Sequence, residues 1–393
     1  MKTHRKSLVI AVATALGTLS ALPVQAIESI KTNTFDFNDL IGVIDTCNVS
    51  TAAVGCNNGA TSSVSLPATL ASPTLSQFDS SDGVLMGAMI ELSSIRTQTI
   101  SGSLTDGIQN KTTTTGSGNS DAKITAPGVE EALESIKLSH SAKVATGVTT
   151  ASFGTSTDTD TYTILTVPDD KLDSYVGSSN GTVIVNLTTS TFNVSSTWSN
   201  GGAKTSPTSK SDSQATYKLR WYGDLAIYYD YLLHAAPSFD GSLSMLTLDL
   251  DFGTVFLGDV ADMDFSIYNL APVTGSPIDR VGLDLDTFDP FPVPFSFNLS
   301  TFYGLASGSN NIYTASMNTS TLGEFKATYH LYFSDEDVGA SSSRFSYQDH
   351  PLMFQLTLNL SGRVEPIPVP EPGALSLLGV GLLGLPFARR RRS

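Results

Sequence analysis

Alternation of apolar and polar side chains with a period of two residues is the feature that most constrains the fold of this chain. The apolar positions are Leu246, Leu248, Leu250, Phe252, Met263, Phe265, Ile267, Phe325, Ala327, Tyr329, Leu331, Phe333, Leu352, Phe354, Leu356, Leu358 and Leu360. Because successive side chains of a strand point to opposite faces, this pattern predicts half-buried antiparallel strands. Turns rich in Gly, Pro, Asn and Ser separate them.

Length and composition extend this prediction to the whole chain. The protein has 393 residues, of which 15% are charged and 40% hydrophobic. A hydrophobic fraction of this size can form a core, and the length suits two domains. The predicted fold is all-β, with two antiparallel β-sandwiches of immunoglobulin-like or jelly-roll-like type and helices in the terminal signal and sorting segments. We place the domains at 27–236 and 243–364, with the boundary between 232 and 246.

The second domain carries a set of short motifs in a characteristic order. They are Asp251–Val255, Leu257–Gly258, Phe265–Leu270, Thr319–Ser320, Leu322–Phe325 and Leu358–Gly362. This order resembles the choice-of-anchor D or ASH-like family of immunoglobulin-like domains. The Pro-rich insert Asp289–Pro294 departs from the family pattern. The resemblance implies a structural or interaction module and carries no catalytic residues.

The first domain is richer in Thr and Ser and less regular. Its motifs are Leu75–Asp79, Gly83–Leu85, Met89–Leu92, Leu172–Gly177, Gly181–Val185 and Tyr228–Tyr231. Together they resemble the choice-of-anchor E domain, an all-β module of proteins with surface-sorting tails, which implies no activity.

Three segments of the first domain depart from the strand pattern. Asn110–Ala122 is a run of Thr, Gly, Ser and Asn that predicts a loop or hairpin tip. Ala203–Gln214 is polar and unpatterned, which predicts a flexible loop. Val129, Leu133 and Ile136 follow Pro127 and Gly128 at helical spacing, so the alternatives there are one short helix or an irregular strand.

The first 26 residues fit a secretory signal peptide. A basic start is followed by the apolar stretch Leu8–Leu22, which is shorter than the ~20 residues of a membrane span. Val24 and Ala26 supply small residues for cleavage between Ala26 and Ile27. We therefore expect signal peptidase to process the chain during export.

The last segment, 365–393, has three ordered parts. Proline alternates with other residues in 366–372, a mostly apolar stretch of about fifteen residues follows over 374–388, and four arginines come next. Such an arrangement is typical of a short transmembrane helix held with its C-terminus inside. The sorting residues are Val369, Pro370, Glu371, Pro372, Arg389, Arg390, Arg391 and Arg392.

This segment resembles the PEP-CTERM sorting signal of Gram-negative bacteria. The resemblance implies recognition by an exosortase, removal of the helix near Pro370–Pro372, and a connection with exopolysaccharide and the biofilm matrix. The expected location is the cell surface or the extracellular space, after transient anchoring in the inner membrane by the C-terminal helix.

Charge and cysteine content agree with export. Seven of the 22 basic residues lie in the two terminal segments, so the remaining 15 face at most 37 acidic residues, a balance near −22. This field would repel nucleic acid. Cys47 and Cys56 are the two cysteines of the chain, and we expect them to form a local disulfide worth roughly 2–3 kcal/mol.

No catalytic motif fits its context, so the sequence favours a protein that is not an enzyme and has no cofactor. Gly177–Gly181 spells Gly-x-Ser-x-Gly, but a strand follows it where a nucleophile elbow needs a helix. Carboxylates gather at Asp249/Asp251, at Asp284/Asp286 and at Asp335, Glu336 and Asp337. The last group is the best candidate for calcium, although a solvated strand end is the simpler interpretation.

An aromatic region offers a binding alternative. It consists of Trp198, Trp221, Tyr222, Tyr228, Tyr229 and Tyr231. Alternation places Tyr229 and Tyr231 on the core side with Ile227, and Tyr228 and Asp230 outward.

The sequence thus predicts an exported structural or interaction protein of the surface or matrix. A polysaccharide-binding module is the alternative, since exposed rings can stack on sugar faces, and a matrix hydrolase is a weaker third hypothesis.

Overall fold

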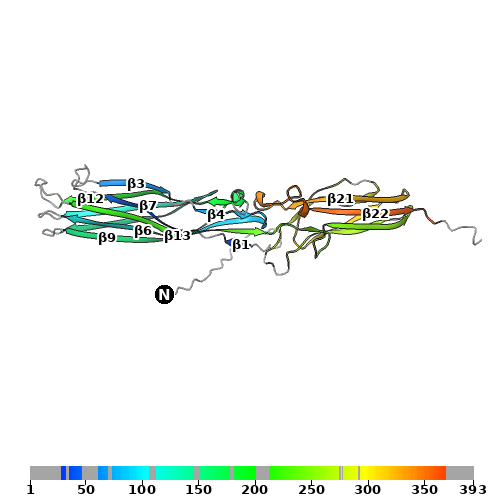
Figure 1. The fold of residues 1–393 in the computed structure, drawn as a ribbon, viewed down its shortest axis with the longest axis horizontal. Helices are drawn as coiled ribbons and strands as arrows, with labels where there is room; N and C mark the ends of the chain where they lie inside the picture. The colour runs from blue at the N-terminus through cyan, green and yellow to red at the C-terminus, as the bar shows by residue number, and fades with distance from the viewer. Residues whose placement is uncertain are drawn as a thin grey trace, which may run out of the picture.

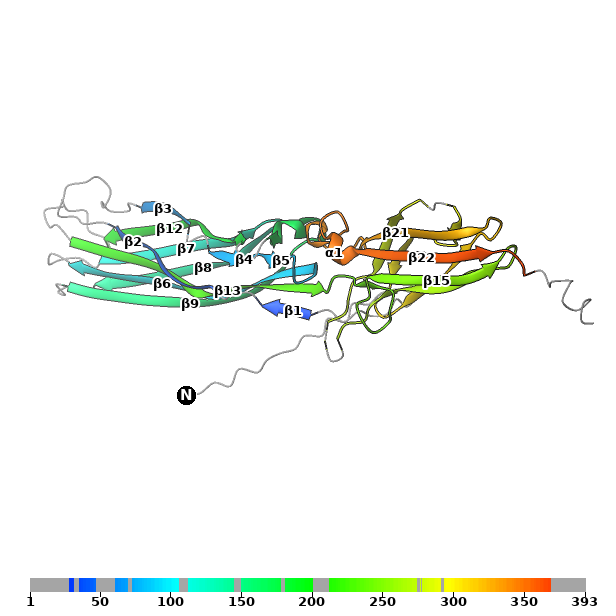
Figure 2. The same ribbon diagram turned by 45° about the vertical axis from the view of Figure 1, so that its right-hand side comes forward.

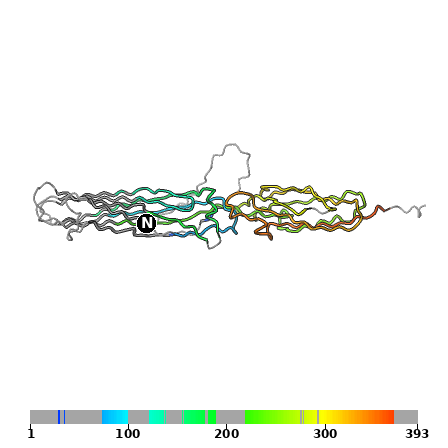
Figure 3. The backbone as a smooth tube through the Cα atoms, turned by 90° about the horizontal axis from the view of Figure 1, so that it is seen from above, coloured from blue at the N-terminus to red at the C-terminus, as the bar shows by residue number. Residues whose placement is uncertain are grey.

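The fold is described from a computed structural model of the chain. It describes residues 28–31, 35–46, 61–69, 73–105, 112–144, 150–177, 181–200, 212–273, 276, 278–290 and 293–368. Two β-structured bodies lie end to end and form an elongated molecule (Figures 1 and 3).

The N-terminal body contains strands β1 to β13 and one 3-10 helix. The strands are β1 (Glu28–Lys31), β2 (Phe35–Thr46), β3 (Thr61–Thr69), β4 (Thr74–Ser76), β5 (Phe78–Asp79), β6 (Val84–Thr105), β7 (Thr112–Ala126), β8 (Val129–Val144), β9 (Thr150–Thr166), β10 (Val176–Gly177), β11 (Thr182–Ile184), β12 (Asn186–Asn200) and β13 (Asp212–Leu232). The 3-10 helix η1 spans Asp169–Tyr175.

Two antiparallel sheets face each other in this body. In the β13 sheet, the order is β1-β13-β6-β9, and β2 also pairs with β13. In the β12 sheet, the order is β3-β12-β7-β8. With 21 residues, β13 alone spans about 70 Å at the usual rise of a strand. The core between the sheets includes Ile90, Ile124, Val185, Trp221 and Ile227, all buried.

The C-terminal body contains the remaining strands. They are β14 (Pro237–Ser238), β15 (Thr247–Phe256), β16 (Asp262–Asn269), β17 (Leu283–Phe288), β18 (Phe295–Phe297), β19 (Phe302–Leu305), β20 (Asn310–Met317), β21 (Gly323–Asp335) and β22 (Gln355–Glu365), with the 3-10 helix η2 (Ser341–Ser343) and the helical turn α1 (Pro351–Phe354).

These strands also form two sheets. The β16 sheet has the order β14-β16-β20-β18, and the β22 sheet has the order β15-β22-β21-β17-β19. The all-β sandwich prediction is therefore confirmed for the described residues. Two pairings of the described strands differ from the antiparallel expectation. β15 runs parallel to β22, with Leu250 opposite Leu360, and the short strand β10 runs parallel to β5.

The period-two pattern sets the core of the C-terminal body. Leu250, Phe265, Tyr329, Leu331 and Leu358 are buried between its sheets. The polar residues that alternate with them face outward, as Asp249 and Asp251 on β15 do. The pattern fails at Leu352, which is 86% exposed. Pro351 is pre-organised for the first position of a helix, so Pro351–Phe354 form a helical turn and the strand begins at Gln355.

The polar segments of the N-terminal body are more regular than predicted. Most of Asn110–Ala122 belongs to β7, because β12 and β8 pair with it on both sides and satisfy its backbone. The segment from Val129 is strand β8 and not a helix. A bulge between Leu133 and Ile136 accounts for its departure from a two-residue period. Of Ala203–Gln214, residues 203–211 lie outside the described part, and β13 begins at Asp212.

A buried carboxylate joins the two bodies. Asp335, at the end of β21, is 3% exposed. Its Oδ1 accepts a bond from the Ala235 N–H at 2.8 Å, and its Oδ2 accepts one from the Phe345 N–H at 2.7 Å. The Nδ1 of His234 lies 2.7 Å from Oδ2, while its Nε2 lies 2.8 Å from the carbonyl oxygen of Ser80 in the N-terminal body.

Further contacts surround this carboxylate. The ring of Phe345 stacks on two histidine rings. Its centroid lies 3.7 Å from that of His234 and 3.6 Å from that of His350. The Ala340 N–H donates to the Leu85 carbonyl at 2.8 Å, and the Leu85 N–H donates to Ser343 Oγ at 3.0 Å. Figure 2 shows α1 at this junction.

The hydrophobic cores also interpenetrate at the junction. Ala340 and Ile278 pack into the N-terminal core, whereas Val84 and Leu232 pack into the C-terminal core. Polar and apolar contacts therefore both cross the junction between the two sandwiches.

Replacement of Asp335 by Ala should destabilise this junction strongly. The change removes the acceptor of His234, Ala235 and Phe345, and breaking a buried pair of this kind typically costs about 3 kcal/mol or more. Urea unfolding followed by fluorescence measures the loss. Asp337→Ala is the control, since this carboxylate pairs with Arg344 while its side chain is 92% exposed. Equal losses of stability in the two variants would contradict the role of Asp335 in joining the two bodies.

Candidate binding surfaces

A shallow groove of about 460 Å³ lies on the outer face of the β22 sheet. It is lined by Asp249, Lys326, Ala327, Thr328, Asn359, Leu360 and Ser361. The polar residues come from β15, β22 and β21, where alternation turns them away from the core.

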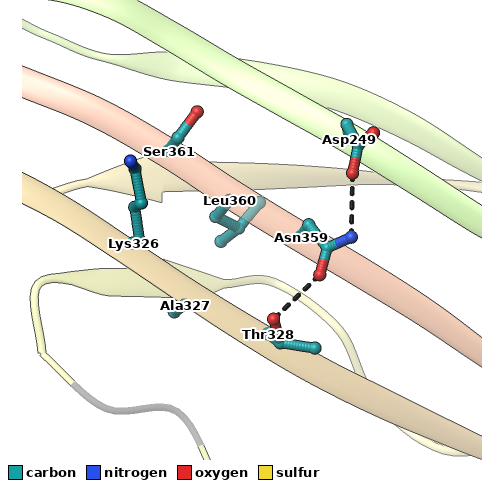
Figure 4. Close-up of a pocket in the computed structure, with 7 residues that line it drawn as sticks. All are labelled: Asp249, Lys326, Ala327, Thr328, Asn359, Leu360 and Ser361. Carbon is teal, nitrogen blue, oxygen red and sulfur yellow. Dashed lines mark hydrogen bonds between the residues drawn. The ribbon is translucent and has the colours of Figure 1, made fainter.

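The groove's polar side chains are joined in a row. Thr328 Oγ1 donates to Asn359 Oδ1 at 2.8 Å, and Asn359 Nδ2 donates to Asp249 Oδ1 at 2.8 Å (Figure 4). Lys326 pairs with Glu324 at 2.8 Å. These groups satisfy one another, so they stabilise cross-strand pairing as well as offering a polar surface.

An acidic corner forms where β17 pairs with β21. Leu283 lies opposite Asp335 in the register, which brings Asp284 and Asp286 near Glu336 and Asp337. The Gly304 N–H donates to Asp284 Oδ1 at 2.6 Å, and Ser334 Oγ donates to Asp286 Oδ1 at 2.9 Å.

Burial governs the protonation of this corner. It raises the pKa of Asp284 to about 6, and the bond from Gly304 opposes that shift while the neighbouring carboxylates add to it. Burial also raises the pKa of Asp286. None of these carboxylates lines the groove of Figure 4.

The three residues singled out for calcium have separate partners. Asp335 accepts the junction bonds described above, and Asp337 pairs with Arg344. Glu336 lies instead beside Asp284. Within the part of the chain that the structure describes, no group of three or more His, Cys, Asp or Glu side chains is arranged to hold a metal ion.

The aromatic region divides between core and surface as alternation predicts. Trp221, Tyr229 and Tyr231 are buried. The Tyr229 hydroxyl donates to the Ser76 carbonyl at 2.9 Å. Tyr228 faces outward and is partly exposed. The side chain of Trp198 lies outside the described part.

Outward-facing residues of three strands form a further surface, which we name the Tyr162–Glu91–Tyr228 patch. Tyr162 of β9 is 64% exposed and Ile164 beside it is 46% exposed. Glu91 of β6 interacts by hydrogen bonding with both tyrosines. Burial raises the pKa of Tyr228 to about 12, with Glu91 adding to the shift, and burial and Glu91 raise the pKa of Tyr162 as well.

Sequence reasoning found Tyr228 but missed Tyr162 and Glu91. A signal for the outward direction of Glu91 was present, because it alternates with the apolar residues Ile90 and Leu92, which are buried. Their proximity depends on the pairing of β6 with both β9 and β13, which joins residues about 70 and 140 positions apart in the chain.

The other predicted positions lie outside the described residues. These are Cys47 and Cys56, the cleavage residues Ala26 and Ile27, and the sorting residues from Val369 to Arg392. The disulfide and the cleavage site remain predictions. No helix within the described ranges is long and apolar enough to cross a membrane.

Comparison with protein families identifies the C-terminal segment. Residues 368–392 match the family described as PEP-CTERM protein-sorting motif. The predicted sorting signal is thus confirmed, and it marks the chain as an exported, exosortase-processed protein sorted to the cell surface. The choice-of-anchor resemblances of the two bodies remain predictions. No curated protein matches this chain.

Comparison with solved structures found distant similarities. The Vibrio cholerae VesB protease aligns at 14% identity and a TM-score of 0.21, over 36% of this chain and 37% of that one. The infectious bursal disease virus Gx strain structure aligns at 8% identity and a TM-score of 0.13, over 55% and 46%, and the Gt strain structure at 9% and 0.12, over 56% and 46%. This chain spans less than half the length of each, and scores this low carry no argument about fold or function.

Removal of the Asp284 charge should change stability in a pH-dependent way. The folded-state pKa of Asp284, about 6, lies above the ordinary value of 3.8. The stability that the protonated carboxyl contributes to the fold is therefore fully present below pH 4, and it is lost as the pH rises through 6. Asp284→Asn should therefore raise stability by roughly 1 kcal/mol at pH 8 and leave it unchanged at pH 3.5. Thermal unfolding at the two pH values measures this. The exposed Asp262→Asn is the control, and a gain that does not vary with pH would contradict the assignment.

Proposed function

We propose that the mature protein is a stiff structural or interaction component of the bacterial surface or extracellular matrix, without enzymatic activity. The observation that carries the proposal is the combination of a surface-sorting motif with a rod whose two bodies are clamped by Asp335. A stiff rod that is sorted to the cell surface is suited to holding a matrix component at a distance from that surface.

The orientation of the rod supports this role. β22 ends at Glu365 at the outer end of the C-terminal body, and the N-terminal body lies at the opposite end (Figure 1). A chain held by its C-terminal segment would therefore project the N-terminal body outward. We infer that the anchoring is transient, and that it ends when the segment after about Pro370 is removed.

Deletion of residues 369–393 should abolish sorting without affecting the fold, because the described sandwiches end before this segment. In producing cells we expect the truncated protein to leave the surface fraction and accumulate in the periplasm or medium. Cell fractionation and intact mass of the mature protein measure this, and the full-length chain should yield a C-terminus near 370–372. An unchanged surface fraction would contradict the sorting role. The control is a cell lacking its exosortase, in which the full-length chain should keep its tail.

Polysaccharide binding is a second candidate function, favoured by the exposed Tyr162–Glu91–Tyr228 patch. Tyrosine rings on a sheet face can stack on sugar rings, and the carboxylate can accept bonds from sugar groups. The mature protein should be retained by at least one matrix glycan of a panel run with and without calcium. Failure to retain any glycan would contradict this candidate while leaving the structural role standing.

A further inference from the structure

The Tyr162–Glu91–Tyr228 patch lies on the outer face of the β13 sheet, where strands β9, β6 and β13 are neighbours. Tyr162 is paired with Ser93, and Tyr228 is paired with Met89, so Glu91 lies diagonally between the two tyrosines. β9 and β13 are two strand spacings apart, about 10 Å. This is a surface of two rings with one acceptor between them.

The two register partners of Glu91 complete the patch. Ala226 is its partner on β13 and is buried at 2% exposure, whereas Ile164 is its partner on β9 and is 46% exposed. Ile164 therefore adds apolar surface beside Tyr162, across β6 from Tyr228. Such a partly apolar surface with one polar group matches a pyranose ring, which has an apolar face and polar edges.

The charges around the patch are mainly negative. Outward positions on the three strands carry Glu91, Asp158, Asp160, Asp224 and Asp230. Lys218 and Arg220 are the basic residues at outward positions of β13, and Arg220 is paired with Thr97, six residues from Glu91 along β6. At the rise of a strand this is about 20 Å away. A further basic residue, Lys31 of β1, is the register partner of Tyr228, on the side of β13 that is away from β6.

We propose that the Tyr162–Glu91–Tyr228 patch binds a polysaccharide that carries free amino groups, an amino-sugar polymer with positive charges. This inference rests on the proposed polysaccharide-binding function and names its site and ligand class. A sugar ring stacks on Tyr162, and an ammonium group of the same chain donates to the Glu91 carboxylate. Asp160 and Asp158 continue the acidic strip along β9, where further ammonium groups of the polymer can bind.

Charge decides between kinds of glycan. The body of the protein carries a balance near −22 when the terminal basic residues are set aside, and acidic polymers such as uronate chains would be repelled. A neutral polymer would gain stacking but no ionic contact. An amino-sugar polymer gains both.

A basic peptide would also carry the required charge, but the surface suits it less. Peptides are commonly recognised by pairing along a strand edge or by insertion into a groove. The patch lies on the face of the sheet instead, and the groove of Figure 4 is in the other body.

The test uses the mature protein recovered from producing cells. The probe is chitosan, a glucosamine polymer, compared with its fully N-acetylated form, with alginate, and with poly-lysine. Affinity electrophoresis should show retention by chitosan, at least tenfold weaker retention by the acetylated polymer, and none by alginate. Retention by chitosan should fall as salt is added, since ionic contacts are screened.

Variants locate the site. Tyr162→Ala and Glu91→Gln should each weaken chitosan binding about tenfold. Tyr303→Ala is the matched control for the ring, because Tyr303 is 76% exposed on the C-terminal body. Asp259→Asn is the matched control for the charge, at an exposed position of that same body. Both controls should bind as the unaltered protein does, and thermal unfolding should show that all four variants fold.

The outcomes are distinguishable. Unchanged binding by Tyr162→Ala and Glu91→Gln would overturn the assignment of the site, even if the protein retains glycans. Equal retention by the acetylated polymer would overturn the requirement for amino groups. Poly-lysine binding that is equal to chitosan binding and equally sensitive to Tyr162→Ala would overturn the preference for a glycan. If no glycan binds at all, the polysaccharide-binding function fails together with the inference, while the surface location is tested separately by fractionation.

Discussion

The arrangement of the whole molecule depends on the buried carboxylate of Asp335. Its two oxygens accept bonds from Ala235 and Phe345 and contact His234, and His234 reaches the N-terminal body at Ser80. A carboxylate at 3% exposure is costly unless it is fully paired. Here the segment that leaves β13 supplies His234 and Ala235, and the segment that follows β21 supplies Phe345. The path of the chain between the sandwiches is therefore fixed by the same group that joins them.

This role also explains why Asp335 attracted a calcium prediction. A carboxylate at a strand end, beside two other acidic residues, has the composition of an oxygen-rich metal site. Protein donors occupy it instead, because Ala235 and Phe345 approach from segments that are about 100 and 10 residues away. Sequence spacing shows which carboxylates could bind a metal ion. Only the fold shows which protein hydrogen-bond donors already occupy those carboxylates.

Much of the C-terminal body could be predicted from the sequence, because its two-residue alternation is strict and its core positions are large. Leu250, Phe265, Leu331 and Leu358 are buried as the pattern requires. The N-terminal body was harder, because its Thr- and Gly-rich segments carry little apolar signal. The segment from Thr112 is a strand because β12 and β8 satisfy its backbone on both sides, and backbone pairing leaves no trace in side-chain polarity.

The candidate sites show the same limit. Asp284 and Asp286 were recognised as one acidic pair and Asp335, Glu336 and Asp337 as another group. The pairing of β17 with β21 instead brings Glu336 and Asp337 to the Asp284 pair, while Asp335 belongs to the junction. Likewise, Tyr162 lies in a strand of alternating Thr and Asp and gave no signal of its own. Tyr162 becomes part of a candidate binding site because the strand order β13-β6-β9 brings Glu91 and Tyr228 beside it. Non-local strand order, set by packing of the whole sheet, is what single-sequence reasoning lacks.

The position of the Tyr162–Glu91–Tyr228 patch bears on how the molecule would carry a mechanical load. The sorting segment follows the end of the C-terminal body, and the patch lies on the other body, beyond the junction (Figures 1 and 2). If the junction were a flexible hinge, a ligand on the patch would not constrain the anchored end. Because Asp335 and the shared core residues Ala340 and Val84 fix the two bodies together, a load on the patch is transmitted along the strands to the anchored end. A stiff connection between the two bodies is needed for one molecule to hold a polymer on its N-terminal body at a set distance from its C-terminal end.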